Sequence, residues 1–307
     1  MNAPQDAPAT DEWFNWLLHE RHGDDSDYAH IVRDAVARFV DRVLDGAGLF
    51  PDMTLVDIGT GDGVVGLRAI ERLGKNIRVI FTDISAPLLQ YTELLAKQRH
   101  VVEQCSFLQC TAENLAAIAD SSVDAVAARA SVAYVADKAA AFREFYRVLK
   151  PGGRMSIAEP IMQDEAFAAR ALKKAVEART DLLADGFLPL LHRWKAAQFP
   201  DTEDGCARNP LVNFSERDLL NLVRGAGFNE IHLQLAIDVT APLNLSWDVF
   251  VNSSPHPWAP TLERIFAERF SQEERRLFES VLRPTVESGK YPTVDRIAYV
   301  IAIKANL

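Results

Sequence analysis

A glycine-rich loop near the start of the chain combines residue types that can bind an anion. The run Thr54–Ile58 is rich in apolar residues and predicts a strand, and Val64–Leu73 continues with helical periodicity. Between them lie Gly59, Thr60, Gly61, Asp62 and Gly63. Glycines permit positive φ angles and close approach of a ligand, and the helix that follows offers free N–H groups to a carboxylate or a phosphate. The sequence therefore predicts an anion-binding turn between a strand and a helix.

The spacing of the loop and two acidic residues narrow the class of ligand. The dinucleotide pattern G-x-G-x-x-G fails when it is counted from Gly59, because its third glycine position falls on Val64. Asp57 precedes the loop, where a carboxylate would meet an ammonium group of the ligand. Asp83 follows the next predicted strand, where it could accept hydrogen bonds from both hydroxyls of a ribose. The simpler interpretation of Asp83 is an acid at the start of the helix predicted over 86–99.

A second motif lies where a predicted helix ends in a proline and two glycines. Phe145–Met155 contains the run Arg-Val-Leu-Lys-Pro-Gly-Gly, which suits the end of a helix and the start of a strand. With this motif, residues 53–160 resemble the class I S-adenosylmethionine-dependent methyltransferases, in particular their small-molecule branch that includes ubiquinone biosynthesis. Residues 214–239 resemble them more loosely.

This resemblance implies S-adenosylmethionine as the cofactor and a small-molecule acceptor. The methyl group would go to an O, N or C atom of an apolar or aromatic metabolite. Two other functions stay open, namely a noncatalytic regulatory module that binds S-adenosylmethionine and an NAD(P)-dependent oxidoreductase.

The resemblance also implies which positions contact the cofactor. Asp57 would bind the methionine ammonium group, Asp83 the ribose, and the stretch Thr111–Glu113 would border the adenine. Arg129 could bind the methionine carboxylate or could tie neighbouring loops together. The full predicted cofactor set is Asp57, Gly59, Thr60, Gly61, Gly63, Asp83, Ile84, Thr111, Ala112, Glu113, Arg129 and Ala130.

The acceptor site has weaker signals. Methyl transfer needs alignment and exclusion of water, and it needs a general base only when the acceptor holds a proton tightly. His192 lies among apolar and aromatic residues and could be that base or could serve only packing. Glu159, after the fifth strand, could contact the acceptor or cap the next helix. His19, Tyr28 and His30 of the N-terminal lid could face the cofactor. A cluster of aromatic residues and prolines could line the acceptor pocket, pack the insertion on the sheet or form a dimer interface; its members are Trp247, Phe250, Pro255, His256, Pro257 and Trp258.

Alternating strand and helix patterns predict an α/β fold with a doubly wound, Rossmann-like sheet of seven strands. We divide the chain into an N-terminal helical lid (1–50), a cofactor-binding core (51–160), a helical cap (161–213) and a C-terminal part of the sheet (214–307). The last two strands are about 50 residues apart, which predicts a structured insertion at about 240–293 with a helical run over 261–286.

The amino-acid composition restricts the classes of molecule that the protein is expected to bind and the compartment in which it is expected to lie. The net charge of −10 and the absence of a basic block argue against a nucleic acid partner. Three scattered cysteines predict neither a disulfide framework nor a metal site, and a reducing cytoplasm is the expected location. The first ten residues do not resemble a signal peptide, and no apolar stretch is long enough to span a membrane.

Overall fold

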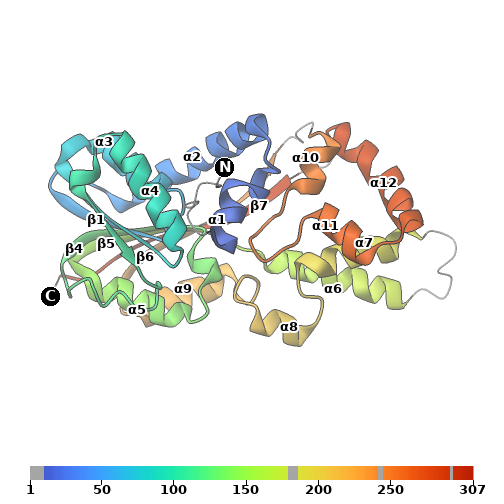
Figure 1. Cartoon of the computed structure of the whole chain (residues 1–307). Coiled ribbons are helices and arrows are strands. Elements are labelled where there is room, and N and C mark those ends of the chain that lie inside the picture. The colour runs from blue at the N-terminus through green and yellow to red at the C-terminus, as the bar shows by residue number, and fades with distance from the viewer. Residues whose placement is uncertain (1–9, 179–185, 241–244, 291–292, 307) are drawn as a thin grey trace.

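One mixed sheet forms the core of one half of the protein, at the left in Figure 1. The computed structural model describes residues 10–178, 186–240, 245–290 and 293–306. Its strand order is β3-β2-β1-β4-β5-β7-β6, with β1 to β5 parallel and β7 antiparallel to both of its neighbours. The strands are β1 (Met53–Ile58), β2 (Ile77–Asp83), β3 (Cys105–Gln109), β4 (Val123–Arg129), β5 (Leu149–Pro160), β6 (Glu230–Thr240) and β7 (Thr293–Ile303). The predicted seven-stranded, doubly wound α/β class is confirmed.

Helices cover both faces of the sheet because alternate strand residues enter two separate apolar layers. Val56 and Ile58 of β1 pack in the layer that contains α5 (Lys138–Val148) and α9 (Glu216–Gly225). Leu55 packs in the other layer, with the helices α2 (Ser26–Ala47), α3 (Val64–Leu73) and α4 (Ala86–Gln98). Such two-sided burial explains why the strands have nearly continuous apolar sequences.

The sheet topology determines where a ligand can bind. Strand β1 lies between β2 and β4, so the chain leaves β1 in one direction to build β2 and β3 and later returns on its other side. At such a reversal the loops at the carboxyl ends of neighbouring strands diverge and leave a crevice. The glycine-rich loop, the end of β2 and the end of β4 all lie at this point.

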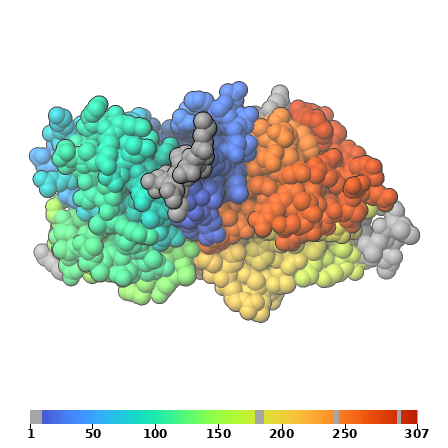
Figure 2. Space-filling model, in the orientation of Figure 1, coloured from blue at the N-terminus to red at the C-terminus, as the bar shows by residue number. Residues whose placement is uncertain are grey.

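A second group of helices forms its own apolar core beside the sheet, seen in yellow to red in Figures 1 and 2. Its members are α7 (Phe187–Gln198) of the predicted cap and three helices of the predicted insertion, α10 (Trp247–Asn252), α11 (Leu262–Arg269) and α12 (Gln272–Glu287). The cap helices α6 (Gln163–Glu177) and α8 (Glu203–Arg208) lie beside them but pack their inward side chains, among them Ala166, Ala169 and Cys206, in an apolar layer of the sheet. The single helical run predicted over 261–286 is wrong, because Ser271 starts a new helix with a capping box to Glu274. Residues 1–9, 179–185, 241–244 and 291–292 of the predicted segments lie outside the described residues.

The N-terminal segment lies between the sheet and the second group of helices (Figure 2). Helix α1 (Glu12–Leu18) is followed by the 3-10 helix η1 (Glu20–His22), and then α2 begins. Trp16 Nε1 donates a hydrogen bond to the carbonyl of Ser254 at 3.0 Å, and the Ser254 N–H donates to the carbonyl of Glu20 at 2.8 Å. These contacts fix the segment across the open end of the crevice. The other 3-10 helices are η2 (Gly74–Asn76), η3 (Val102–Gln104) and η4 (Val132–Tyr134).

Candidate functional site

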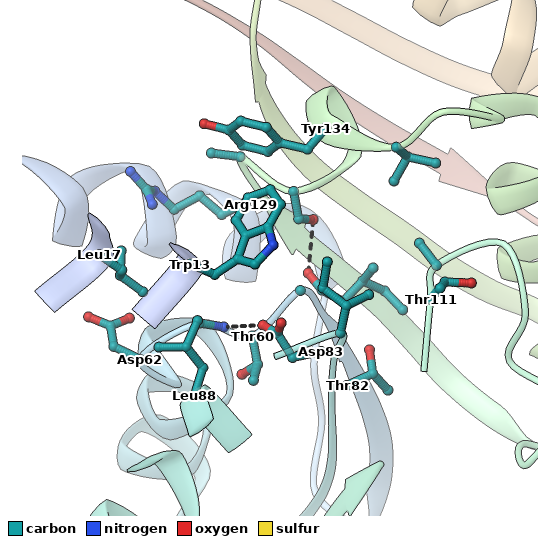
Figure 3. Close-up of a pocket in the computed structure, with 18 of the residues that line it drawn as sticks. Trp13, Leu17, Thr60, Asp62, Thr82, Asp83, Leu88, Thr111, Arg129 and Tyr134 are labelled. Atoms are coloured by element: carbon teal, nitrogen blue, oxygen red, sulfur yellow. Dashed lines mark hydrogen bonds between the residues drawn. The ribbon is translucent and has the colours of Figure 1, made fainter. Parts of the chain in front are cut away.

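A cavity of about 430 Å³ lies at the carboxyl ends of β1, β2 and β4 (Figure 3). The glycine-rich loop forms its floor and α1 with η1 forms a cover. Its remaining walls come from the end of β2, the connection after β3, the loop after β4, and Trp258 of the insertion. Concave sites with apolar walls and a few polar groups are typical binding sites for small molecules.

The loop floor requires glycine at two positions. Gly59 and Gly61 have φ angles of 60° and 56°, in the left-handed region that L side chains seldom adopt. A Cβ on Gly59 would lie 2.5 Å from the Cβ of Ser131, and a Cβ on Gly61 would lie 2.9 Å from Leu17 Cδ2. At Gly59 both the backbone conformation and the space oppose a side chain, whereas at Gly61 the backbone conformation is the main obstacle because the end of Leu17 can move. The loop can then present its backbone to a ligand without obstruction.

Asp57 lies beneath the loop and is not part of the cavity wall. It is 1% exposed, and its Oδ2 accepts hydrogen bonds from Thr60 Oγ1 at 2.7 Å and from the Gly66 N–H at 2.9 Å. Gly66 belongs to the first turn of α3, so Asp57 satisfies one of the N–H groups that a helix start leaves without a partner. The direct contact with an ammonium group predicted for Asp57 is therefore corrected to a role in shaping the loop.

Burial of Asp57 makes the stability of the loop depend on pH. Loss of hydration raises the pKa of Asp57 from 3.8 to about 7. A raised pKa in the folded state favours folding below the unfolded value of 3.8, and this contribution is lost as pH rises through about 7. We expect the stability of Asp57→Asn, measured relative to wild type by thermal unfolding, to improve between pH 4 and pH 8. A constant difference across this range would contradict the assignment.

Asp83 reaches the cavity at the end of β2. Its Oδ2 accepts a hydrogen bond from the Gly61 N–H and its Oδ1 accepts one from the Ser85 N–H, each at 2.9 Å. Burial raises the pKa of this carboxyl group. Because each carboxylate oxygen has two lone pairs, both oxygens can still accept hydroxyl donors from the cavity. The geometry suits a diol such as that of a ribose.

An apolar slot adjoins Asp83. Ile84 is 47% exposed, which is high for an isoleucine beside a cavity. Leu88, Cys110 and Ala112 also line the cavity. A flat heterocycle in this slot would remove apolar surface from water and stabilise the complex at about 25 cal/mol per Å² buried. The slot and the carboxylate together fit an adenosine.

The loop after β4 is held in a strained conformation by a buried carboxylate. Ala130 has a φ of 48°, which costs a non-glycine residue about 1–2 kcal/mol. Glu159 is fully buried and accepts hydrogen bonds from the N–H groups of Ser131 at 3.3 Å and Ala133 at 2.9 Å. Ser131 Oγ in turn donates to the carbonyl of Ile58 at 2.9 Å. Glu159 therefore positions the loop that carries Arg129 into the cavity, and it is not itself part of the cavity wall.

Comparison with known proteins identifies a class of proteins that part of the chain resembles. Residues 49–200 match a family model described as "Methyltransferase domain". A ubiquinone/menaquinone biosynthesis C-methyltransferase, UbiE, of Xanthomonas oryzae pv. oryzae is 38% identical over 130 residues, covering 42% of this chain and 46% of that relative. Residues 49–200 are therefore similar to a methyltransferase domain. The chain spans about half the length of the relatives that it matches.

Solved structures show that this methyltransferase fold extends over most of the chain. The YcgJ protein of Bacillus subtilis aligns with a TM-score of 0.53 at 19% identity, over 87% of this chain and 98% of that one. The [4+2]-cyclase SpnF aligns with a TM-score of 0.51 at 20% identity, over 89% and 82% of the two chains. At these identities the likeness concerns the fold alone.

Most of the predicted cofactor residues lie at the cavity. Those that line it are Gly59, Thr60, Gly61, Asp83, Ile84, Thr111, Ala112, Glu113, Arg129 and Ala130. Gly63 does not line it, although its φ of 76° ends the loop, and a Cβ there would lie 2.6 Å from Thr92 Cγ2. In Figure 3, Thr111 lies on the opposite side of Asp83 from Arg129 and Tyr134.

The cavity does not include His192, which we predicted as a general base. His192 lies on α7, and its Nε2 is 2.9 Å from Asp201 Oδ2, within the second group of helices. The apolar and aromatic residues around His192 in the sequence pack within that group of helices, so their pattern says nothing about the cavity. Of the lid candidates, His19 and His30 are exposed, and neither they nor Tyr28 line the cavity.

Replacing His192 should therefore leave the methyltransferase site intact. We expect His192→Ala to bind S-adenosylhomocysteine with wild-type affinity, measured by isothermal titration calorimetry, and to keep the wild-type pH profile of methyl transfer. The physical reason is that its partner Asp201 also lies outside the cavity wall. A folded variant with reduced transfer would restore His192 as a candidate base.

Sequence reasoning missed several cavity residues on distant segments. Trp13 and Arg21 come from the lid, Asp62 from the loop, and Tyr134 from η4. Trp258 is the one member of the predicted aromatic cluster among the described cavity residues. Within the described ranges, no group of three or more histidine, cysteine or acidic residues could hold a metal ion, and no helix is long and apolar enough to cross a membrane.

Proposed function

We propose that this protein transfers the methyl group of S-adenosylmethionine to a small-molecule acceptor. The observation that carries the proposal is the joint position of the Asp83 carboxylate and the two constrained glycines at one cavity. The likeness to a relative named as a quinone-biosynthesis C-methyltransferase supports the reaction class.

Different residues of the cavity bind different parts of the donor. Asp83 accepts hydrogen bonds from the ribose hydroxyls, and Ile84 with Ala112 packs against the adenine. Arg129 donates to the methionine carboxylate, since guanidinium and carboxylate groups match in a two-point geometry. Bound S-adenosylmethionine supplies an electrophilic methyl group on a sulfonium centre. The chain's task is then to align the acceptor with that carbon and to exclude water.

The acceptor side of the cavity is aromatic. The rings of Trp13, Tyr134 and Trp258 lie with their centroids 5.1 to 5.8 Å apart and all line the cavity. Rings of this kind favour a planar or apolar acceptor. The lid covers part of the cavity, which favours a small acceptor, and a net charge of −10 disfavours nucleic acid. A cytoplasmic location and a homodimer remain predictions.

Two measurements test the proposal. We expect wild-type protein to bind S-adenosylhomocysteine but not NAD⁺ in calorimetry, and to move a labelled methyl group from S-adenosylmethionine into a deproteinised bacterial extract. NAD⁺ binding without S-adenosylhomocysteine binding would indicate the oxidoreductase. Binding of S-adenosylhomocysteine without transfer of label to any fraction would indicate a noncatalytic function.

A further inference from the structure

Two arginines line the cavity without an ion-pair partner among the described residues, although the charge of Asp62 acts on both. Arg129 enters from the end of β4 and Arg21 enters from η1 in the lid. Among the described residues, neither guanidinium has an ion pair or a hydrogen bond from its side chain, although Arg21 lies 5.7 Å from the Trp16 ring. Burial lowers the pKa of Arg129 to about 10 and also lowers the pKa of Arg21. Partly buried cations without partners are costly, so this arrangement indicates that anions belong in the cavity.

We assign the single carboxylate of the donor to one of these arginines, Arg129. Under the proposed function, S-adenosylmethionine brings one carboxylate together with two cationic groups, its ammonium and its sulfonium. Arg129 takes the carboxylate, while the sulfonium adds a positive charge to the same cavity. Asp62 also lines the cavity, but it forms no ion pair with Arg21 within the described residues. With the donor carboxylate on Arg129, the Arg21 guanidinium stays free to bind a second anion in the cavity.

Aromatic rings surround the place where that second anion would lie. Trp13 and Tyr134 have centroids 5.1 Å apart in an edge-to-face arrangement, and Trp258 lies 5.3 Å from Tyr134. Figure 3 shows Arg129 extending toward Tyr134 and Trp13, away from Thr111. The far end of the cavity therefore pairs cationic groups with flat apolar walls.

The described cavity wall also contains no histidine. Its ionisable members besides the two arginines are the carboxyls of Glu12, Asp62, Asp83 and Glu113, the thiol of Cys110, and the Tyr134 phenol, whose pKa is raised by burial. Asp83 already accepts a hydrogen bond from the Gly61 N–H of the loop. An acceptor that arrives with its negative charge in place would not depend on a strong base supplied by the chain.

We propose that the acceptor is a planar organic acid, whose ionised group is bound by Arg21 while its body packs against Trp13, Tyr134 and Trp258. This inference rests on the proposed function. An electron pair of the acceptor forms the bond to the methyl carbon as the carbon–sulfur bond breaks, and the electrons of that bond stay on sulfur as a neutral thioether. When the reacting atom is itself the ionised one, the transfer releases no proton.

The test separates a bacterial extract by charge before the reaction. A deproteinised extract is divided on ion exchangers into acidic, neutral and basic pools, and each pool is incubated with protein and methyl-labelled S-adenosylmethionine. We expect acceptor activity in the acidic pool. Separation before the reaction matters because methylation of an acid can remove its charge.

Variants of Arg21 then test whether this residue binds the acidic acceptor. We expect Arg21→Gln to lower transfer at limiting acidic pool by roughly 10- to 100-fold, the loss that one charge-assisted hydrogen bond gives. Arg21→Lys should retain part of the activity because it keeps the charge. Affinity for S-adenosylhomocysteine should stay at the wild-type value in both. The matched control is Arg33→Gln, an exposed arginine of α2 that does not line the cavity.

Each alternative outcome contradicts the inference in a distinct way. Acceptor activity in the neutral or basic pool, or in none, would overturn the acidic acceptor. Wild-type transfer by Arg21→Gln would remove Arg21 from acceptor binding, and a parallel loss of S-adenosylhomocysteine affinity would make Arg21 a donor residue. Failure of the wild-type protein to bind S-adenosylhomocysteine would instead contradict the proposed function itself.

Discussion

Replacing Asp83 with alanine is expected to weaken S-adenosylhomocysteine binding by at least about 100-fold. The carboxylate would accept two ribose hydroxyls, and hydrogen bonds to a charged group contribute about 1.5–3 kcal/mol each. The same change removes the acceptors of the Gly61 and Ser85 N–H groups, which fix the loop and the start of α4. Binding and positioning are therefore lost together, and calorimetry with S-adenosylhomocysteine measures the combined effect.

Matched variants separate this effect from general destabilisation. Asp83→Asn keeps one acceptor oxygen and should bind with intermediate affinity. Asp34→Asn changes an exposed acid of α2 and should leave binding unchanged. If Asp83→Ala remains folded and binds with wild-type affinity, the nucleoside end of the donor lies elsewhere in the cavity.

The glycine-rich loop and its neighbours could be predicted because their signals are local. The predicted helix Val64–Leu73 has the observed bounds, and the predicted strand 54–58 is one residue short at its start. Periodicity and glycine placement depend on neighbours within a few residues, so the sequence contains them directly. The capping box that Ser215 forms with Asp218 at the start of α9 depends on equally local residues.

The cover of the cavity could not be predicted because it depends on contacts far apart in the chain. Arg21 reaches the cavity only because the lid is bonded to Ser254 of the insertion. His192 has an equally suitable side chain, but its helix packs in another core. The role of Asp57 could not be predicted either, because the residues around it in the sequence do not reveal that the Gly66 N–H donates a hydrogen bond to its carboxylate.

Replacing Glu159 with alanine is expected to reduce the free energy of unfolding by about 3 kcal/mol. Glu159 is fully buried, and its removal leaves the N–H groups of Ser131 and Ala133 without acceptors. Each unsatisfied buried group costs about 1–3 kcal/mol, and an empty space adds to the loss. Denaturant unfolding monitored by circular dichroism measures this change.

The position of Glu159 predicts a second effect, on donor binding. The Glu159 bonds hold the loop in which Ala130 keeps its strained φ, so their loss should let Arg129 leave the cavity. We expect Glu159→Ala to weaken S-adenosylhomocysteine binding even at temperatures where the variant is fully folded. Glu159→Gln keeps the shape and one acceptor oxygen, and it should restore most of both properties. If Glu159→Ala lowers stability but binds S-adenosylhomocysteine as wild type does, the carboxylate serves the fold alone and Arg129 is positioned by other contacts.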